Sequence, residues 1–415
     1  MTPSIRPPGP PDIVLLDGGI QNYAWGTTHE IPEFLGVPTT DRPVAEWWLG
    51  AHQTLSSTVR DLQGPENGKS LRQVIAEDPV LWLGDAADQF RGELPFLLKF
   101  LSIGAPLSLQ VHPSLTQARE GFERENAAGL SLTSPNRNYR DPNHKPELIV
   151  ALRPMTVLCG FARPADSTAL LRKIGAVDET LTVFATTLEN DSSESSIRDL
   201  VRRILTATTE QATRWTNVVA ERARSAGANY LHEIALRYPG DPGVIVAVLL
   251  NHVVLAPGEG LFLQAGQLHA YLSGFGIELL ANSDNVLRGG LTPKHVDVPE
   301  LLDTIRPIAE SADVLRPESL GAHVVGWRTS AADFSLRRVD LESVHDAAQL
   351  GVDAGPRIVV CTGGLIDLRV GETGQTQTLR QGEVAYVRPN AELTLATEGR
   401  GTAFVASIAQ AKLNN

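Results

Sequence analysis

Short runs of strand length follow one another through much of the chain and end at turn residues. In some of these runs hydrophobic and polar residues alternate with a period of two, and others, such as 94–102, are almost entirely apolar. Such runs predict β-strands, which we expect in residues 13–60, 94–102 and 146–152. From about residue 320, strand-length runs and turns follow one another closely, which is typical of an antiparallel barrel or sandwich. In this part we expect R-I-V-V-C-T-G-G and L-I-D-L-R-V-G to form two successive strands. The pattern therefore predicts a mainly β protein.

A helical period replaces the alternation in three places. Ser70 precedes apolar residues at helical spacing, and residues 115–127 predict a second short helix. The longest helical part, residues 164–238, contains an amphipathic stripe with Ser196 as its cap: Ile197, Leu200, Val201, Ile204 and Leu205. We interpret the stripe as core packing rather than a binding face. After the G-D-P-G turn at 240–243 we expect strands to return and to run to about residue 300.

The stretch L-S-L-Q-V-H-P combines polar and apolar residues in a way that suits a metal site. Gln110 and His112 lie two residues apart, so on a strand they point to one face, while Leu109 and Val111 point to the other. With the Glu147 carboxylate and one more histidine, this set suits a divalent metal such as zinc. The alternative is that Gln110 and His112 only satisfy their own hydrogen bonds at a strand edge. The stretch alone favours that alternative.

One charged residue interrupts the apolar run L-P-F-L-L-K-F-L-S at 94–102. If Lys99 points inward from a buried strand, it costs free energy unless it has a partner or a function. Otherwise its long side chain reaches the rim of the core and leaves its ammonium group in water. The sequence leaves both possibilities open.

Composition excludes several classes of function. The formal net charge of −12 argues against a nucleic-acid partner, although a few Lys and Arg residues can still bind a small anion. No apolar segment is long enough to cross a bilayer, and the Pro-rich start of the chain has no apolar run typical of a signal peptide. The two cysteines, Cys159 and Cys361, are too few for a disulfide framework or a cysteine zinc site. We therefore expect a cytoplasmic protein without a membrane partner.

Two stretches have the glycine spacing of a jelly-roll turn. In A-P-G-E-G-L-F-L-Q-A-G-Q-L-H-A-Y-L (256–272), a strand and turn lead to His269 at the start of the next strand, aimed into the barrel. This stretch resembles the second cupin motif, with Gln264 where proline is more usual. The matching stretch at 381–391 has no histidine, and none follows His345. We therefore expect two cupin-like barrels, with metal ligands only in the first.

The polar stretch 277–294 contains glycine and proline turn signals, so we expect a loop there. Arg288 offers a planar guanidinium suited to a phosphate or a developing enediolate. For Arg288 and for Lys294, each considered alone, a surface salt bridge is the more ordinary interpretation.

Together, eight motifs resemble the type I mannose-6-phosphate isomerases. They follow that family's order, cover most of residues 20–300, and are specific only in combination: Q-N-Y-A-W-G, A-E-W-W-L-G-A-H, L-P-F-L-L-K-F-L-S, L-S-L-Q-V-H-P, N-H-K-P-E, L-C-G-F, Q-L-H-A-Y-L and S-D-N-V-L-R-G-G-L-T-P-K. The chain departs from the family where Q-A-G-Q-L-H replaces P-A-N/G-E-x-H and where R-G-G-L replaces R-A-G-L. Both departures concern turn geometry and remove no ligand.

The resemblance implies a set of site residues. The zinc ligands would be Gln110, His112, Glu147 and His269, with one Zn²⁺ per chain. Arg288 would be catalytic, and the proton-transfer group would be one of three residues: His144, Lys145 or Asp284. Lys99, Ser108 and Lys294 would bind substrate. Trp25 and Glu46 match motif residues near the pocket mouth, where core or rim packing is the expected role.

The implied reaction converts mannose 6-phosphate to fructose 6-phosphate through a cis-enediol. The partner would be a small sugar phosphate, and we expect a monomer. A non-catalytic sugar-phosphate-binding cupin protein is the alternative, and loss of Arg288 or of a zinc ligand would have favoured it. A cupin oxygenase would prefer two His, one carboxylate and iron. The extra Gln110 and the dense Lys/Arg set argue against it.

The resemblance also implies a domain organisation. A zinc-binding catalytic jelly roll would comprise residues 1–163 plus 239–315, interrupted by a helical insertion at 164–238. A metal-free jelly roll would follow at 316–415. The expected fold is thus mainly β, with two cupin-like jelly-roll barrels and an α-helical insertion domain.

Overall fold

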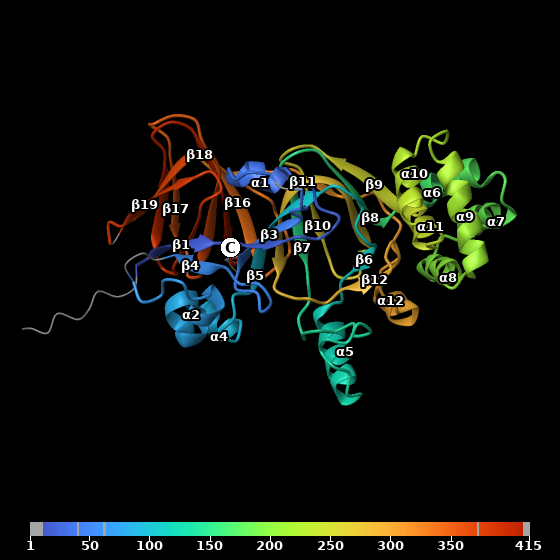
Figure 1. Ribbon diagram of the computed structural model, residues 1–415, viewed down its shortest axis with the longest axis horizontal. Coiled ribbons are helices and arrows are strands. Elements are labelled where there is room, and N and C mark those ends of the chain that lie inside the picture. The colour runs from blue at the N-terminus through green and yellow to red at the C-terminus, as the bar shows by residue number, and fades with distance from the viewer. Residues whose placement is uncertain (1–10, 40, 61–63, 372, 410–415) are drawn as a thin grey trace, which may run out of the picture.

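Two antiparallel sheets lie side by side along the long axis of the molecule, and a group of helices occupies one end (Figure 1). The computed structural model describes residues 11–39, 41–60, 64–371 and 373–409. Residues 1–10 and 410–415, which the sequence assigned to the two jelly rolls, lie outside the described residues. The prediction of a mainly β protein is confirmed.

The first sheet has eleven strands among the described residues. Its main path, in order, is β13 (Val314–Leu315), β10 (Gly260–Leu263), β7 (Glu147–Ala151), β11 (His269–Ala281), β5 (Phe96–Ile103), β3 (Glu46–Gly50) and β2 (Gly19–Gln21). Four further strands join it through β11: β6 (Gln110–Val111), β12 (Leu287–Arg288), β8 (Met155–Phe161) and β9 (Leu250–Leu255). Arg288 therefore lies on a short strand and not on the expected loop, because β12 pairs with β6.

The second sheet also has eleven strands in the part of the chain that the structure describes. Its main path is β14 (Glu318–Gly321), β15 (Val324–Gly326), β16 (Ser335–Leu341), β22 (Gly401–Ser407), β18 (Arg357–Val370), β20 (Val384–Val387), β1 (Ile13–Asp17) and β4 (Thr58–Arg60). It is completed by β17 (Ala347–Val352), β19 (Thr376–Arg380) and β21 (Glu392–Ala396). Because β1 and β4 belong to this sheet, the predicted boundary at 315/316 does not separate the two sheets.

One long strand in each sheet connects two sets of partners. The first part of β11 pairs with β6 and β8, a register shift follows at Tyr271/Ser273, and its second part pairs with β5 and β7. β18 likewise pairs first with β20 and β22 and then with β19 and β21, with a shift at Cys361/Gly363. The expectation of two strands in 357–370 is therefore wrong. The register shift between Cys361 and Gly363 is of the kind that a β-bulge produces, and it lies within one continuous strand.

A shared hydrophobic core joins the sheets. Every residue of β5 is buried, so both faces of this strand are covered. One face carries Phe96, Leu98 and Phe100 into a cluster that also contains Tyr386 and Phe404 of the second sheet, and Phe334, which directly precedes β16. The other face carries Leu97, Lys99 and Leu101, and it forms the wall of the candidate site.

Six helices form the group at the end of the molecule: α6 (Pro164–Gly175), α7 (Glu179–Asn190), α8 (Glu194–Leu205), α9 (Thr209–Arg222), α10 (Asn229–Arg237) and α11 (Gly243–Val248). The amphipathic stripe of α8 is buried as expected, but its cap is Ser193, whose side chain accepts a hydrogen bond from the backbone N–H of Ser196. The expectation of strands directly after 243 is wrong, because α11 follows. All six residues of α11 are buried, so it has no polar face to reveal its helical period.

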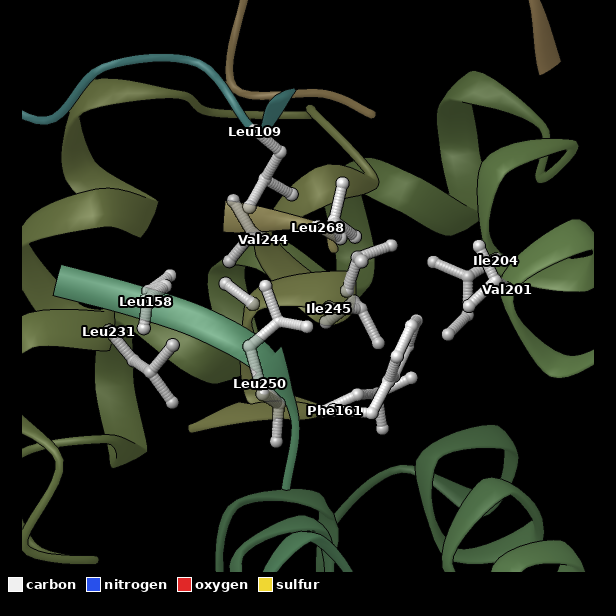
Figure 2. Close-up of a cluster of buried hydrophobic side chains, with 14 of the residues drawn as sticks. Leu109, Leu158, Phe161, Val201, Ile204, Leu231, Val244, Ile245, Leu250 and Leu268 are labelled. Carbon is white, nitrogen blue, oxygen red and sulfur yellow. The ribbon is translucent and has the colours of Figure 1, made fainter. Parts of the chain in front are cut away.

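The helical group packs on the back of the site strands. Figure 2 shows Leu109, Leu158 and Leu268 around Val244 and Ile245 of α11, and all five belong to one buried cluster. Leu109 and Val111 thus point away from Gln110 and His112, as the alternation predicts.

The remaining helices are α1 (Glu30–Leu35), α2 (Leu71–Glu77), α3 (Pro79–Leu83), α4 (Ala86–Gln89), α5 (Leu115–Ala127) and α12 (Val298–Thr304). The predicted cap of α2 is confirmed, since Ser70 Oγ accepts from Gln73 N. α5 also begins and ends as predicted, behind a capping box of Ser114 and Gln117. α12 lies where the sequence predicted the last strands before residue 300. Among the described helices, none has the length and apolar character required to span a membrane.

Candidate active site

Three site residues lie in one row across adjacent strands. His269 of β11 is directly opposite Gln110 of β6, and Gln110 is directly opposite Arg288 of β12. Residues that are directly opposite in antiparallel strands point to the same face. Pairing across the sheet therefore brings together residues that are far apart in sequence. Gln110 Nε2 also donates to Ser108 Oγ at 3.3 Å, so Ser108 lies beside this row.

His112, Glu147 and His269 form a buried cluster that can hold a metal ion, and it is the one such group of three among the residues that the structure describes. Glu147 Oε1 lies 3.2 Å from His112 Nε2, and Glu147 Oε2 lies 3.5 Å from His269 Nε2. Their three potential ligand atoms lie within 4.8 Å of one another. The predicted ligand Gln110 stands opposite His269 at the edge of the cluster.

The hydrogen bonds of the two histidines use Nδ1 on each ring, so that Nε2 of each ring lies near Glu147. His112 Nδ1 lies 2.7 Å from Asn285 O, and His269 Nδ1 lies 2.9 Å from Gln267 O. His112 Nε2 is buried and, although it lies 3.2 Å from Glu147 Oε1, it has no hydrogen bond of acceptable geometry with any described residue. Burial lowers the pKa of His112 to about 4, so its ring is neutral at neutral pH. A backbone carbonyl on Nδ1 with a free Nε2 is the arrangement of a metal-binding histidine, so the residues present fit a metal ion.

Lys145 faces the cluster from the same segment as Glu147. Its Nζ lies 2.9 Å from Glu147 Oε1, and both side chains are buried. Burial alone would raise the pKa of Glu147, but Lys145 and His112 outweigh it and hold that pKa well below its usual range. Burial would lower the pKa of Lys145, but Glu147 and Glu278 outweigh it and raise the value. In the protein as described, both groups are charged.

A second group of buried charged side chains, Lys99, Glu46 and Glu278, is connected to the metal cluster through Tyr271. Lys99 lies 3.7 Å from Glu46 Oε2 and 3.9 Å from Glu278 Oε2, so it has buried partners and does not extend to the rim. Tyr271 donates to Glu278 at 2.9 Å and connects it to Glu147 at 3.5 Å. Burial and Glu147 raise the pKa of Glu278 to about 7. Trp25 packs at the side of a core cluster, as expected.

Sequence reasoning did not single out Glu278 or Tyr271. The available signal for Glu278 was one acidic residue in the apolar run I-E-L-L-A.

His144 and Asp284 each have a partner outside the metal cluster. His144 Nε2 lies 3.0 Å from Asp333 Oδ2, which comes from the C-terminal half of the chain. Asp284 Oδ1 lies 3.3 Å from His52 Nε2. Although burial would raise the pKa of Asp284, its hydrogen bond with His52 contributes to lowering it to about 2. His144 and Lys145 are adjacent, so on an extended segment they point to opposite sides.

Asn285 connects the parts of the site and was also missed from sequence. It is completely buried, and its amide bonds to the segment 140–143, with Oδ1 2.7 Å from Arg140 N and Nδ2 2.9 Å from Asn143 O. Its backbone carbonyl accepts from His112. Its position within S-D-N-V-L-R was visible in the sequence, but its partners 145 and 173 residues away were not.

The fold and the cluster define a class: a two-sheet β protein with one buried metal-binding group set on its strands. Similarity to known proteins identifies the family within this class. Residues 13–164 match the family described as phosphomannose isomerase type I, catalytic domain. The chain is 36% identical to the mannose-6-phosphate isomerase of Escherichia coli (strain K12) over 93% of this chain and 97% of that protein. It is 30% identical to that of Homo sapiens over 93% and 95%.

The structural comparisons agree. A mutant of phosphomannose isomerase from Salmonella typhimurium superposes with a TM-score of 0.88 at 32% identity, covering 96% of this chain and 100% of that one. A zinc-bound holo structure of mannose 6-phosphate isomerase gives 0.86 at 33% identity, with the same coverage. The chain therefore belongs to the type I mannose-6-phosphate isomerase family, and the resemblance inferred from its motifs is confirmed.

Proposed function

We propose that this protein is a zinc-dependent isomerase that interconverts mannose 6-phosphate and fructose 6-phosphate through a cis-enediol intermediate. The observation that carries this proposal is the buried His112–Glu147–His269 cluster, with its orphaned Nε2, in a chain whose relatives are named mannose-6-phosphate isomerase. Gln110 is the proposed fourth ligand because it stands opposite His269. Zinc bound there would supply a positive charge that polarises the sugar oxygens next to the transferred proton.

Arg288 is the proposed stabiliser of the enediolate. It neighbours Gln110 across the strand pair, and its side chain makes no ion pair with any described residue. Its charge is therefore available to negative charge that develops on the substrate, and fixed charges of this kind are effective because they need no reorganisation.

Lys145 is the proposed proton-transfer residue. Of the three candidates it alone contacts the metal cluster, at 2.9 Å from Glu147, whereas His144 is bonded to Asp333 and Asp284 to His52. Geometry is the first requirement for a group that moves a proton between C2 and C1. Because Glu147 and Glu278 raise the pKa of Lys145, its ammonium group must give up a proton before it can accept one from the sugar carbon. We propose that Asp284 instead positions the segment that precedes β12 through its contact with His52.

The other predicted substrate residues divide by charge. Lys294 has no ion-pair partner among the described residues and its charge interacts with that of Arg288, so we propose that it binds the phosphate. Ser108, which accepts a hydrogen bond from Gln110, is proposed to bind a sugar oxygen. Lys99 is already neutralised by Glu46 and Glu278, so we propose that it organises the wall and does not bind phosphate.

We further propose that the two sheets are cupin-like jelly rolls, of which only the first binds metal, with residues 164–238 as an insertion. The domain boundaries stay those expected from sequence, apart from β1 and β4, which pair within the second sheet. A monomer that acts in the cytoplasm on a small sugar phosphate fits a chain with two cysteines and a net charge of −12.

The test is a coupled assay that detects fructose 6-phosphate formed from mannose 6-phosphate by the zinc-loaded protein. Arg288→Ala should retain its zinc and lose turnover by about 10²–10³-fold, the cost typical of one oxyanion donor. Arg369→Ala, which removes an exposed arginine from β18, should leave turnover unchanged. Binding of mannose 6-phosphate without any turnover would support the alternative, a non-catalytic sugar-phosphate-binding protein.

A further inference from the structure

Three positively charged side chains gather beside the metal cluster without an acidic partner among the described residues. They are Arg288, which is half-buried, and Lys294 and Arg140, which are exposed. The three are close enough to influence one another. After burial, Arg140 is the cause that lowers the pKa of Arg288, and Arg288 and Arg140 both lower that of Lys294. The three charges form a local excess of positive charge in a protein whose formal net charge is −12.

The position of Arg140 is fixed by a buried residue and not by its own side chain. Asn285 Oδ1 accepts hydrogen bonds from Arg140 N at 2.7 Å and from Asp141 N at 3.3 Å. Asn285 Nδ2 donates to Asp141 O at 2.7 Å, and the carbonyl of Asn285 is bonded to His112. Asn285 also lies three residues before Arg288 in the chain. One buried amide therefore ties Arg140 both to the metal cluster and to the strand that carries Arg288.

The metal cluster and the positively charged side chains follow one another along the direction that crosses the strands. His269, Gln110 and Arg288 occupy successive strands, which are spaced by about 4.8 Å, so Arg288 lies at the outer side of the metal cluster. Lys294 and Arg140 are near enough to Arg288 for their charges to interact with it. An open-chain sugar phosphate has the same order, because its C1 and C2 oxygens are at one end and its dianionic phosphate is at the other.

We propose that Arg140 is a phosphate-binding residue, which together with Lys294 holds the 6-phosphate at the outer end of this row while C1 and C2 lie at the metal cluster. This inference rests on the proposed function. Clustered cations repel one another unless an anion joins them, and a guanidinium can bond two phosphate oxygens at once. Arg140 thus sets substrate position at a distance from the bond changes, and Arg288 remains free to face the enediolate.

Two measurements on the zinc-loaded protein test the role of Arg140. One is the KM and kcat for mannose 6-phosphate, and the other is the affinity for inorganic phosphate by calorimetry. Arg140→Ala should raise KM and weaken phosphate binding by about tenfold, the effect of one charge-assisted hydrogen bond at an exposed site. The effect should fall on KM more than on kcat. Arg140→Lys should recover part of the affinity, since it keeps the charge but not the planar fork.

The control is Arg369→Ala, which removes an exposed arginine from β18 in the second sheet (Figure 1). It should change neither measurement. The thermal midpoint of Arg140→Ala should match that of the parent protein, because Asn285 holds the backbone of residue 140 and not its side chain.

The outcomes separate this inference from the proposed function. If the parent protein isomerises mannose 6-phosphate but Arg140→Ala leaves both KM and phosphate affinity unchanged, Arg140 is not a phosphate ligand. If the parent protein does not isomerise the sugar but binds inorganic phosphate, and Arg140→Ala weakens that binding, the phosphate site stands and the isomerase assignment fails. Equal losses in Arg140→Ala and Arg369→Ala would also overturn the inference, because they would indicate a general effect of net charge.

Discussion

The charged side chains around the metal cluster differ in whether the protein has already neutralised them. Lys99 is enclosed by Glu46 and Glu278, and Asp284 is bonded to His52, so these two charges are satisfied within the fold. Arg288 has no such partner in the part of the chain that the structure describes, and it lies opposite Gln110. The unsatisfied groups are the ones that gain most from a substrate, because a buried or half-buried charge without a partner is costly.

The choice between adjacent residues gives the first prediction. Lys145→Met should retain zinc and lose turnover by about 10²–10⁴-fold, because it removes the proposed proton-transfer group. His144→Gln, which keeps a hydrogen-bonding side chain toward Asp333, should lose less than about tenfold by the same comparison. The measurements are kcat, zinc content and deuterium incorporation at C2 during turnover in heavy water. Loss of exchange in His144→Gln with normal exchange in Lys145→Met would reverse the assignment.

Glu278 makes stability depend on pH. Its pKa is about 7 in the folded protein and near 4.5 without burial. Between these values the folded state holds more protons than the unfolded state, so the free energy of unfolding falls as the pH rises from about 4.5 to about 7 and stays lowered above that. Glu278→Gln is neutral at every pH and keeps an acceptor for Tyr271. It should remove this slope.

Urea unfolding of the metal-free protein at about pH 5 and about pH 8 checks the prediction. The gain in stability from Glu278→Gln should be larger at the higher pH. An equal effect at both pH values would show that Glu278 is already ionised in the folded state at the lower pH.

At the scale of single elements, the strands position the site and the glycines set how closely they approach their neighbours. Gly290 has a φ of +116°, and a Cβ built there would lie 2.6 Å from Gly243 Cα at the start of α11. A Cβ at Gly289 would lie 3.3 Å from Leu268 Cδ1, the end of a flexible side chain. Position 289 is the one at which the chain departs from the family's R-A-G-L.

The two glycines therefore give a matched pair. Gly289→Ala should change the free energy of unfolding by less than about 1 kcal/mol, and Gly290→Ala should lower it by roughly 1–3 kcal/mol, the usual cost of a strained backbone. Denaturant unfolding of both variants supplies the comparison. A larger loss in Gly289→Ala than in Gly290→Ala would mean that the close approach of Gly290 to the start of α11 is not what requires a glycine in this turn.

Elements with a clear period could be predicted from the sequence, and elements without one could not. The alternation around Gln110 and His112 correctly predicts which side chains face the site, and the stripe on α8 correctly predicts a buried face. β12 has two residues, so no alternation marks it, and α11 is apolar on every side. The prediction of Ser196 as the cap is wrong because Ser193, three residues earlier, has the same hydroxyl group and directly precedes the first residue of the helix.

At the scale of the whole molecule, the two sheets share a hydrophobic core, and two N-terminal strands belong to the second sheet. β1 and β4 of the N-terminal part pair within the C-terminal sheet, and Trp82 O accepts a hydrogen bond from Tyr386 in that sheet. Asp333 in turn reaches His144 at the edge of the site. The hydrophobic pattern of a strand predicts which of its faces is buried, but it does not identify the strand with which it pairs. Pairings over such separations therefore could not be predicted from the sequence. The sequence accordingly gave no sign that β1 and β4, which precede residue 316, pair within the second sheet.

A fragment tests this dependence. Residues 316–415 alone lack β1 and β4 and would expose the aromatic face that packs against β5. We expect this fragment to aggregate or to unfold without a cooperative transition, whereas the full chain unfolds cooperatively. Circular dichroism and thermal unfolding give the comparison. A cooperative transition of the isolated fragment would show that the second sheet is an independent domain.

The central claim is that His112, Glu147 and His269, with Gln110, bind one zinc ion on which isomerisation depends. The most direct test removes metal with a chelator, verifies its absence by elemental analysis, and then adds zinc stepwise while fructose 6-phosphate formation is measured. The account predicts no turnover without metal and a linear recovery that stops at one zinc per chain. Full turnover by the verified metal-free protein, or turnover that does not follow bound zinc, would contradict it.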